Sequence, residues 1–174
     1  MHRWLVVLST FLVAAAGLTG VCAAAPHAWA GDAPIGHIGD TLRVDTGTYV
    51  ADVTVSNVVP VPPPPGFGYT RSGVPVKSFP GSSVARADVT VRAVQVPNPY
   101  ILATNFSFNG VTPFADAYKP RPCDAPDWLD AALGNAPQGA IVRGGVYWDA
   151  YRDPVSTVVL LDRKTGHHLA QWNL

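Results

Sequence analysis

The 174-residue sequence predicts an all-β fold, an antiparallel β-sandwich of about seven or eight strands. Segments in which apolar and polar residues alternate recur along the chain between turn residues, which is the pattern of half-buried strands. The chain is rich in Val, Thr, Gly and Pro, and only one segment has a convincing helical pattern. Strands that do not alternate with helices indicate two packed antiparallel sheets rather than a helix-covered parallel sheet.

The two clearest strands lie in the first half of the chain. In "TYVADVTVS", the residues expected on one face are Tyr49, Ala51, Val53 and Val55. In "VARADVTVRA", the corresponding residues are Ala85, Ala87, Val89, Val91 and Ala93. Because successive strand residues point to opposite faces, these apolar side chains should line the core, and the polar residues between them should face water.

A hairpin is predicted next. The segment "LATNFSF" alternates, and the residues expected on one face of a strand are Leu102, Thr104, Phe106 and Phe108. Asn109-Gly110 follows directly, and this dipeptide is typical of a tight hairpin turn. The return strand would contain Phe114 and Tyr118.

Three more strands complete the sandwich. They are predicted in "AIVRGGVYWDAY", "VSTVVLLD" and "HHLAQWNL", and the last two are joined by a turn at Arg163–Gly166. Trp148 and Trp172 belong to this group and are the natural large side chains to fill the space between two sheets.

Two segments interrupt the strand pattern. "VVPVPPPPGFGY", residues 58–69, cannot be a central strand, because proline donates no hydrogen bond and favours an extended polyproline geometry. We expect a stiff connection along a sheet edge. Residues 119–135 form an inserted loop with one short helix, capped by Asp124 or Asp127 and ended by Gly134. Its expected apolar side consists of Trp128, Leu129, Ala132 and Leu133.

Residues 1–30 are expected to be a signal peptide. Arg3 supplies the positive start, residues 4–21 are almost wholly apolar, and small Ala28 and Ala30 stand at the positions that a signal peptidase recognises. We therefore expect cleavage between Ala30 and Gly31 and a secreted or cell-wall-associated protein.

Residues 1–30 have two alternatives to cleavage. The apolar run is long enough to be a marginal membrane anchor, but no Lys/Arg cluster follows it. Lipid attachment at Cys22 would need a small residue before the cysteine, and Val21 is bulky. Cleavage leaves residues 31–174 as one domain of ordinary size, with a chain that does not span a membrane.

Charge argues against nucleic acid as a partner. All twelve acidic residues are Asp, and loss of Arg3 with the signal changes the formal charge from 0 to −1. So small a net charge gives no electrostatic attraction to nucleic acid or to an anionic membrane surface.

Asp45-Thr46-Gly47 is the first candidate for chemistry. Aspartic proteases carry this tripeptide after an apolar strand, and Leu42 and Val44 precede it here. Such enzymes need two carboxylates that share one proton, so a chain with a single copy could work only as a dimeric, retroviral-type protease. The alternative is a turn between two strands, since Asp, Thr and Gly are turn-forming residues. We favour the turn.

Cys123 is the second candidate. Once Cys22 leaves with the signal it is the one remaining cysteine, in a compartment that permits disulfides. It precedes the predicted helix, but no local sequence resembles that of a cysteine hydrolase. We expect a loop thiol packed beside Trp128, with a disulfide-linked dimer through Cys123 as the alternative.

Two further motifs predict no site. His167 and His168 should point to opposite faces of a strand, so they cannot jointly hold a metal. Asn105-Phe106-Ser107 matches a glycosylation acceptor, but the absence of Glu and the abundance of Ala, Arg, Pro and Gly indicate a GC-rich bacterial genome. We interpret these as three strand residues.

Six motifs in a fixed order resemble a known family. They are "GHIGDTLRVDTG", "VTVSNVV", "PGFGYTRSGVPV", "ARADVTVRAVQ", "PQG" and "GGVYWDAYRDP", and "LAQW" follows near the C-terminus. Together they resemble the small immunogenic secreted antigens of mycobacteria, which are immunoglobulin-like β-sandwich proteins. The resemblance covers nearly all of residues 36–173, and the segment Lys119–Asn135 departs from it.

The resemblance implies a secreted, single-domain protein of an actinobacterium, recognised by host immunity in some members. It supplies no catalytic residue, cofactor or metal ligand to carry over. We therefore expect a non-enzymatic binding or antigenic module that recognises an unknown protein or envelope component through Pro60–Tyr69 and Lys119–Asn135. The alternative function is the dimeric aspartic protease that uses Asp45.

Overall fold

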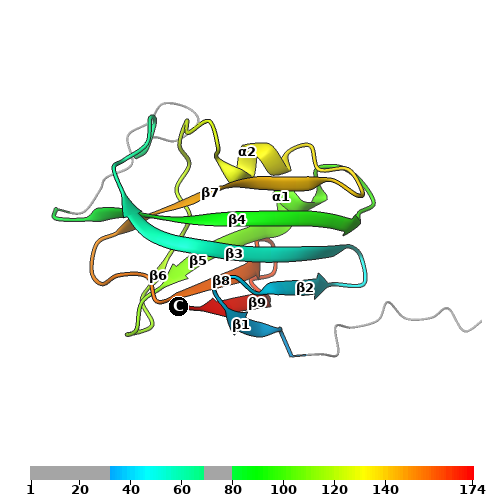
Figure 1. Ribbon diagram of the computed structural model, residues 1–174, viewed down its shortest axis with the longest axis horizontal. Helices are drawn as coiled ribbons and strands as arrows, with labels where there is room; N and C mark the ends of the chain where they lie inside the picture. Colours follow the sequence, from blue (N-terminus) through cyan, green and yellow to red (C-terminus); the bar gives the residue numbers. More distant parts are fainter. Residues whose placement is uncertain (1–31, 69–79) are drawn as a thin grey trace, which may run out of the picture.

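The computed structural model describes residues 32–68 and 80–174, and the expected signal peptide lies outside them. Nine strands in the described residues form two sheets packed face to face (Figure 1). One sheet has the order β1-β9-β8-β5-β6, with strands Ile35–His37, His168–Asn173, Thr157–Asp162, Phe106–Val111 and Ala117–Tyr118. The other has the order β2-β3-β4-β7, with strands Thr41–Asp45, Val50–Val61, Ser83–Gln95 and Ile141–Ala150. The predicted all-β sandwich is confirmed.

Strand pairing departs from the prediction in one place. β1 runs parallel to β9, whereas the other pairings between these strands are antiparallel. The strand count exceeds the predicted seven or eight because β1 was not predicted: it has only three residues, which is too short for an alternating pattern.

The core lies between the sheets where the alternation placed it. All predicted inward residues of β3 and β4 are buried, from Tyr49 to Val55 and from Ala85 to Ala93. Trp148 and Trp172 are fully buried, and both indole nitrogens donate a hydrogen bond to a backbone oxygen, to Phe108 O at 2.9 Å and to Asp40 O at 3.0 Å. Each tryptophan therefore fills the core without leaving a buried polar group unpaired.

The predicted hairpin at residues 102–118 is wrong in its first half. Ile101–Asn105 forms a short helix, α1, in which Leu102 is buried, so Leu102 and Thr104 are not strand residues. Leu102 and Phe106 are four residues apart, a spacing that suits one helix face as well as a strand face. The described residues therefore contain a second helix besides the one predicted within residues 119–135.

The dipeptide Asn109-Gly110 is not a turn. Both residues are buried within β5, and a Cβ on Gly110 would lie 2.8 Å from Val155 Cγ2 and 3.1 Å from Trp148 Cδ2. Glycine is needed there because Val155 and Trp148 cover the strand. The turn follows later, where Thr112 Oγ1 accepts hydrogen bonds from the backbone of Phe114 and Asp116.

The return strand is shorter than predicted. Phe114 lies at the tip of the turn with 76% of its surface exposed, whereas Tyr118 is buried in β6. The Tyr118 hydroxyl donates to Asp153 O at 2.8 Å and accepts the backbone N–H groups of Arg152 and Asp153. β6 is thereby attached to the connection between β7 and β8.

The predicted helix is present as α2, Leu129–Leu133, and ends at Gly134 as expected. The expected cap is wrong: the N-cap is Trp128, no side chain caps the helix, and Asp127 is engaged elsewhere. Leu129 and Leu133 are buried, but Ala132 is exposed, because a helix of five residues turns only a narrow side toward the sheet.

The proline segment begins as a strand that has a neighbour on one side. Pro60 and Val61 are the end of β3 and pair with β4, whereas β2 pairs only with Val50–Thr54. A register shift between Ser56 and Val59, with Asn57 at a φ of 53°, bends this end of β3. The expectation of a connection throughout residues 58–69 is therefore wrong for residues 58–61, which are strand residues, and the connection begins at residue 62. Its last residue, 69, lies outside the described residues. Proline is tolerated in this end of β3 because it has a neighbour on one side only among the described strands.

Candidate binding site

The structure places Asp45 in a turn. It is the last residue of β2, its carboxylate Oδ1 accepts the backbone N–H of Gly47 at 2.9 Å, and Gly47 has a φ of 75°. Thr46 N–H donates to Tyr49 O at 3.1 Å and closes the turn into β3. The carboxylate is exposed and shapes the backbone, as the turn interpretation predicts, and Asp45 lines neither of the cavities described below.

Cys123 is a buried thiol in a small apolar cluster. The cluster lies apart from the main core, on the outer face of β4 and β7, and contains Val61, Phe67, Val84, Cys123, Ala125, Trp128 and Tyr147. Only 4% of Cys123 is exposed, and burial raises the pKa of its thiol above the ordinary value. Both features oppose a reactive thiolate, and the burial keeps the sulfur from contact with a second molecule.

His167 and His168 form no joint site. His167 is exposed before β9, whereas Nε2 of His168 is buried without a hydrogen-bond partner in the part of the chain that the structure describes. No group of three or more His, Cys or acidic side chains that could hold a metal occurs among residues 32–68 and 80–174.

The glycosylation motif spans a helix end and a strand start. Asn105 is the last residue of α1, is 4% exposed, and donates from Nδ2 to Ile101 O at 2.9 Å. The interpretation of Asn105, Phe106 and Ser107 as three strand residues is therefore wrong for Asn105. The buried amide also makes it a poor acceptor for a glycan.

The insert, residues 119–135, packs along β7 (Figure 1). Arg121 N–H donates to Tyr147 O at 2.8 Å, and Gly145 N–H donates to Asp127 O at 2.7 Å. A Cβ on Gly144 would lie 2.6 Å from Asp127 O and 2.7 Å from Leu129 Cα, both of which are backbone atoms. Gly144 therefore allows the insert to approach the edge strand β7 closely.

Three polar side chains hold the insert on the outer face of this sheet. Arg86 reaches from β4 and donates from Nε to the Tyr147 hydroxyl at 3.1 Å and from Nη2 to Asp127 Oδ2 at 2.5 Å. The Tyr147 hydroxyl donates to Asp127 Oδ1 at 2.8 Å. Burial alone would raise the pKa of Asp127, but the hydrogen bonds from Arg86 and Tyr147 outweigh it and hold the pKa below its ordinary value.

The two segments predicted as recognition surfaces are joined. Asp124 N–H donates to Pro65 O at 2.7 Å, and Phe67 packs into the Cys123 cluster. Within the insert, Cys123 and Ala125 are buried, whereas Pro122, Asp124 and Pro126 are exposed. We call residues 60–67 the proline connection. The proline connection and the insert form one continuous surface over the outer face of β4 and β7.

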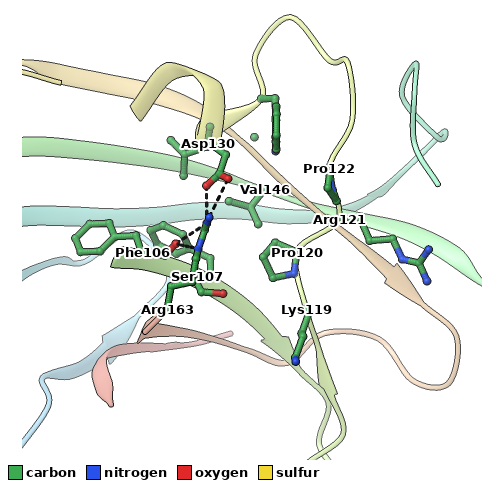
Figure 2. Close-up of a pocket in the computed structure, with 13 residues that line it drawn as sticks. Phe106, Ser107, Lys119, Pro120, Arg121, Pro122, Asp130, Val146 and Arg163 are labelled. Carbon is green, nitrogen blue, oxygen red and sulfur yellow. Dashed lines mark hydrogen bonds and ion pairs between the residues drawn. The ribbon is translucent and has the colours of Figure 1, made fainter. Parts of the chain in front are cut away.

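A cavity of about 240 Å³ lies beneath the insert, between its first residues, α2 and β5 (Figure 2). Its lining combines apolar side chains with a few polar ones: Phe106, Ser107, Phe108, Lys119, Pro120, Arg121, Pro122, Trp128, Leu129, Asp130, Gly145, Val146 and Arg163. Figure 2 shows Pro120 and Pro122 across from the Arg163 guanidinium, with the Arg121 side chain turned away from it. A concave, mostly apolar site with a few polar groups is the usual form of a ligand site.

Arg163 and Asp130 form the polar centre of this cavity. Arg163 Nη2 lies 2.7 Å from Asp130 Oδ1, and Nη1 lies 3.3 Å from Oδ2, so the ion pair is bidentate. Arg163 also donates from Nε and Nη2 to Phe106 O, at 3.1 and 2.7 Å. The guanidinium thus connects α2 to the edge of β5 in a fixed orientation.

A second, more open cavity of about 590 Å³ adjoins the first. It is lined by Ala103, Thr104, Pro122, Trp128, Asp130, Gly134 and Arg163, four of which line the first cavity as well. The two cavities form a groove that passes over the Asp130–Arg163 pair, from Ser107 to Thr104. We call it the Asp130 groove.

The sequence pattern does not predict this groove. Asp130 and Arg163 lie in segments recognised only as a helix and a turn, and nothing in their local sequence indicates that they meet. The one available signal was Trp128, a large aromatic residue beside an acidic one in an inserted loop. Pairing with a residue 33 positions away cannot be read from that pattern.

The chain matches no protein-family model and no curated protein sequence. Among solved structures it is similar to MPT63, described as a secreted protein from Mycobacterium tuberculosis, with a TM-score of 0.59 and 20% identity over 82% of this chain and 98% of that chain. The two proteins share a fold.

A second similar structure is a protein from Staphylococcus aureus described as a candidate lipoprotein, with a TM-score of 0.44 and 7% identity over 78% of this chain and 92% of that chain. The MPT63 likeness supports the β-sandwich that the sequence motifs imply. Membership of the family, the signal peptide and a binding role stay predictions. In the described residues, no helix is long and apolar enough to cross a membrane.

Proposed function

We propose that the protein is an exported, non-enzymatic binding protein of an actinobacterial envelope or secretome. It recognises a protein or envelope component through the joined surface of the insert and the proline connection. The expected signal peptide and the resemblance to secreted mycobacterial antigens support export, and the MPT63 fold is compatible with it.

One observation carries this proposal: a separate apolar cluster holds the two segments together. Cys123 and Ala125 from the insert pack with Val61 and Phe67 from the proline connection, outside the main core. The main core lies between the sheets and does not include this cluster. Its effect is to fix two loops against each other, and loops fixed on a rigid sheet are the usual carriers of recognition.

The residues with catalytic potential support a binding role over chemistry. The Asp45 carboxylate is used by a turn, and the raised pKa of the Cys123 thiol disfavours the nucleophilic form. A site for recognition needs neither group.

Point substitutions on the joined surface test the proposal. Deletion of the insert would be a poor experiment, because Leu129 and Leu133 of α2 belong to the main core. Pro63 and Pro126 are exposed and make no core contact, so the double variant Pro63→Lys/Pro126→Lys changes the surface alone. Thr48→Lys, in the β2–β3 turn at the other end of β3, is the matched control.

The mature protein would be immobilised and exposed to cell-envelope extracts and to host secreted proteins. We expect at least one component to be retained by the wild type and the control, and retained about tenfold less by the double variant. Retention that is equal in all three proteins, or no retention at all, would contradict the proposal.

A further inference from the structure

The Asp130 groove has the features of a site for a polar but uncharged ligand. The Asp130 and Arg163 side chains are 31% and 41% exposed, so both can be reached from solvent. Their charges cancel within the groove. Lys119, at one end, is exposed, and its side chain extends away from Asp130 in Figure 2. An anion would meet the Asp130 carboxylate, and a cation would meet the guanidinium, so a neutral ligand is favoured.

The Asp130–Arg163 pair keeps spare hydrogen-bonding capacity. A guanidinium has five N–H groups, and four hydrogen bonds to Phe106 O and Asp130 account for Nε, both protons of Nη2 and one proton of Nη1. Each Asp130 oxygen accepts one of these bonds and has room for another. With respect to residues 32–68 and 80–174, an unused donor therefore lies beside unused acceptors. This arrangement suits a hydroxyl group, because a hydroxyl both donates and accepts.

Apolar walls flank this polar pair along its length. Trp128 and Pro122 line both cavities, and Pro120 lines the first. An aromatic side chain beside paired polar groups offers packing for the C–H face of a sugar ring and hydrogen bonds for its hydroxyls. A cavity of about 240 Å³ that continues into a larger open one suits a chain of sugar rings better than a single compact ligand.

An extended peptide would need free main-chain carbonyl groups at the β5 edge, and two of these accept side-chain hydrogen bonds. The carbonyl oxygen of Phe106 accepts from Arg163, and that of Phe108 accepts from the indole of Trp148. Strand addition requires such carbonyls to be available. The edge of β5 beside the groove is thus a poor site for the addition of a peptide strand.

We propose that the Asp130 groove binds a segment of neutral glycan, with sugar hydroxyls on Asp130 and Arg163 and a sugar ring against Trp128. The inference rests on the proposed function and names the ligand class of the same face of the molecule. In an exported protein, such a groove would hold the molecule on a polysaccharide.

Calorimetric titration of the mature protein with neutral oligosaccharides tests the inference. The probes are linear gluco-, manno-, galacto- and arabino-oligosaccharides, and a library of short extended peptides is titrated in parallel. We expect saturable binding of at least one oligosaccharide, weakened at least about tenfold by Trp128→Ala and by Asp130→Asn. The matched control is Asp116→Asn, which alters an exposed pair with Arg152 (2.6 Å) that does not line the groove.

A third variant distinguishes loss of binding from loss of the folded structure. Asp130→Asn weakens the contact between α2 and β5, so a loss of binding could reflect a displaced helix. Thr104→Arg places a bulky side chain at an exposed position in the groove and removes neither member of the Asp130–Arg163 pair. We expect it to weaken binding as strongly as Asp130→Asn, with circular dichroism and melting temperature close to those of the wild type.

Three results would overturn the glycan assignment. The first is absence of binding to every oligosaccharide, the second is binding unchanged by Trp128→Ala and Thr104→Arg, and the third is peptide binding that these variants abolish. If the joined surface still retains a component through Pro63 and Pro126 while no oligosaccharide binds, only the glycan assignment fails. If neither experiment shows binding, both proposals fail.

Discussion

Arg121 and Asp149 form an ion pair beneath the insert, with Arg121 Nη2 2.9 Å from Asp149 Oδ2. The Arg121 side chain is 16% exposed and that of Asp149 is 3% exposed. An ion pair of this depth costs desolvation when it forms, and breaking it by removal of one partner is strongly destabilising. It therefore ties the start of the insert to β7.

We expect Asp149→Asn to lower the free energy of unfolding by about 3 kcal/mol, because the Arg121 charge loses its carboxylate in a buried setting. Asp52→Asn is the control, since Asp52 pairs at 3.5 Å with Arg43, whose side chain is 60% exposed. That change should cost no more than about 1 kcal/mol. Urea denaturation measures both, and equal losses would show that the Arg121–Asp149 pair does not tie the insert to the sheet.

The two neighbouring glycines of β7 should differ in their tolerance of alanine. A Cβ on Gly144 would meet backbone atoms of Asp127 and Leu129, whereas one on Gly145 would meet the side chains of Arg86 and Tyr147 at 2.7 and 2.9 Å. Backbone atoms can yield only if the insert moves. We expect Gly144→Ala to destabilise the protein by about 3 kcal/mol, and Gly145→Ala by roughly 1 kcal/mol. The reverse order in urea denaturation would contradict the close approach described here.

Cys123 should react slowly with thiol reagents while the protein is folded. Its burial and raised pKa both oppose attack by the thiolate. We expect reaction with a chromogenic disulfide to be slower by at least about 100-fold in the folded protein than in urea, because the thiol reacts only when the structure opens. The secreted protein should run as a monomer on non-reducing gels. A covalent dimer would establish the disulfide-linked alternative instead.

Acid should destabilise the protein partly through Asp127. The pKa of Asp127 in the folded protein lies below its ordinary value of 3.8, so the folded state favours the ionised carboxylate. That stability is present above the ordinary pKa and is lost as the pH falls through the lowered pKa. We expect Asp127→Asn to flatten the decrease in unfolding free energy between about pH 5 and pH 2. If the unfolding free energies of wild type and variant fell in parallel with pH, the hydrogen bonds from Arg86 and Tyr147 would not favour the ionised form of Asp127.

The strand faces could be predicted because burial on one side leaves a period of two in the sequence. Residues 49–55 and 85–93 alternate without interruption, and their inward residues are buried as expected. Trp148 and Trp172 could be placed in the core for the same reason. These features depend on the immediate sequence and on the general rule that apolar area is removed from water.

The features that were predicted wrongly, or not at all, depend on residues far away in the chain. Gly110 resembles a turn glycine, but contact with Trp148 and Val155 requires a residue without a side chain at that point of β5. Asp127 resembles a helix cap, but Arg86 and Tyr147 bind its carboxylate. The Asp130 groove likewise needs Arg163 from a different turn. Local patterns do not record which distant partner a polar group or a glycine will meet.

The insert is fastened at both ends, and this has a practical consequence. Before the insert, the Tyr118 hydroxyl attaches β6 to Asp153 O. At the beginning of α2, Arg163 binds Asp130. Between these points, Cys123 and Ala125 anchor the chain, while Asp124 and Pro126 are exposed and line neither cavity of the Asp130 groove. Those exposed positions can be varied while the scaffold is kept, which would make this β-sandwich a compact frame for displaying selected surface residues.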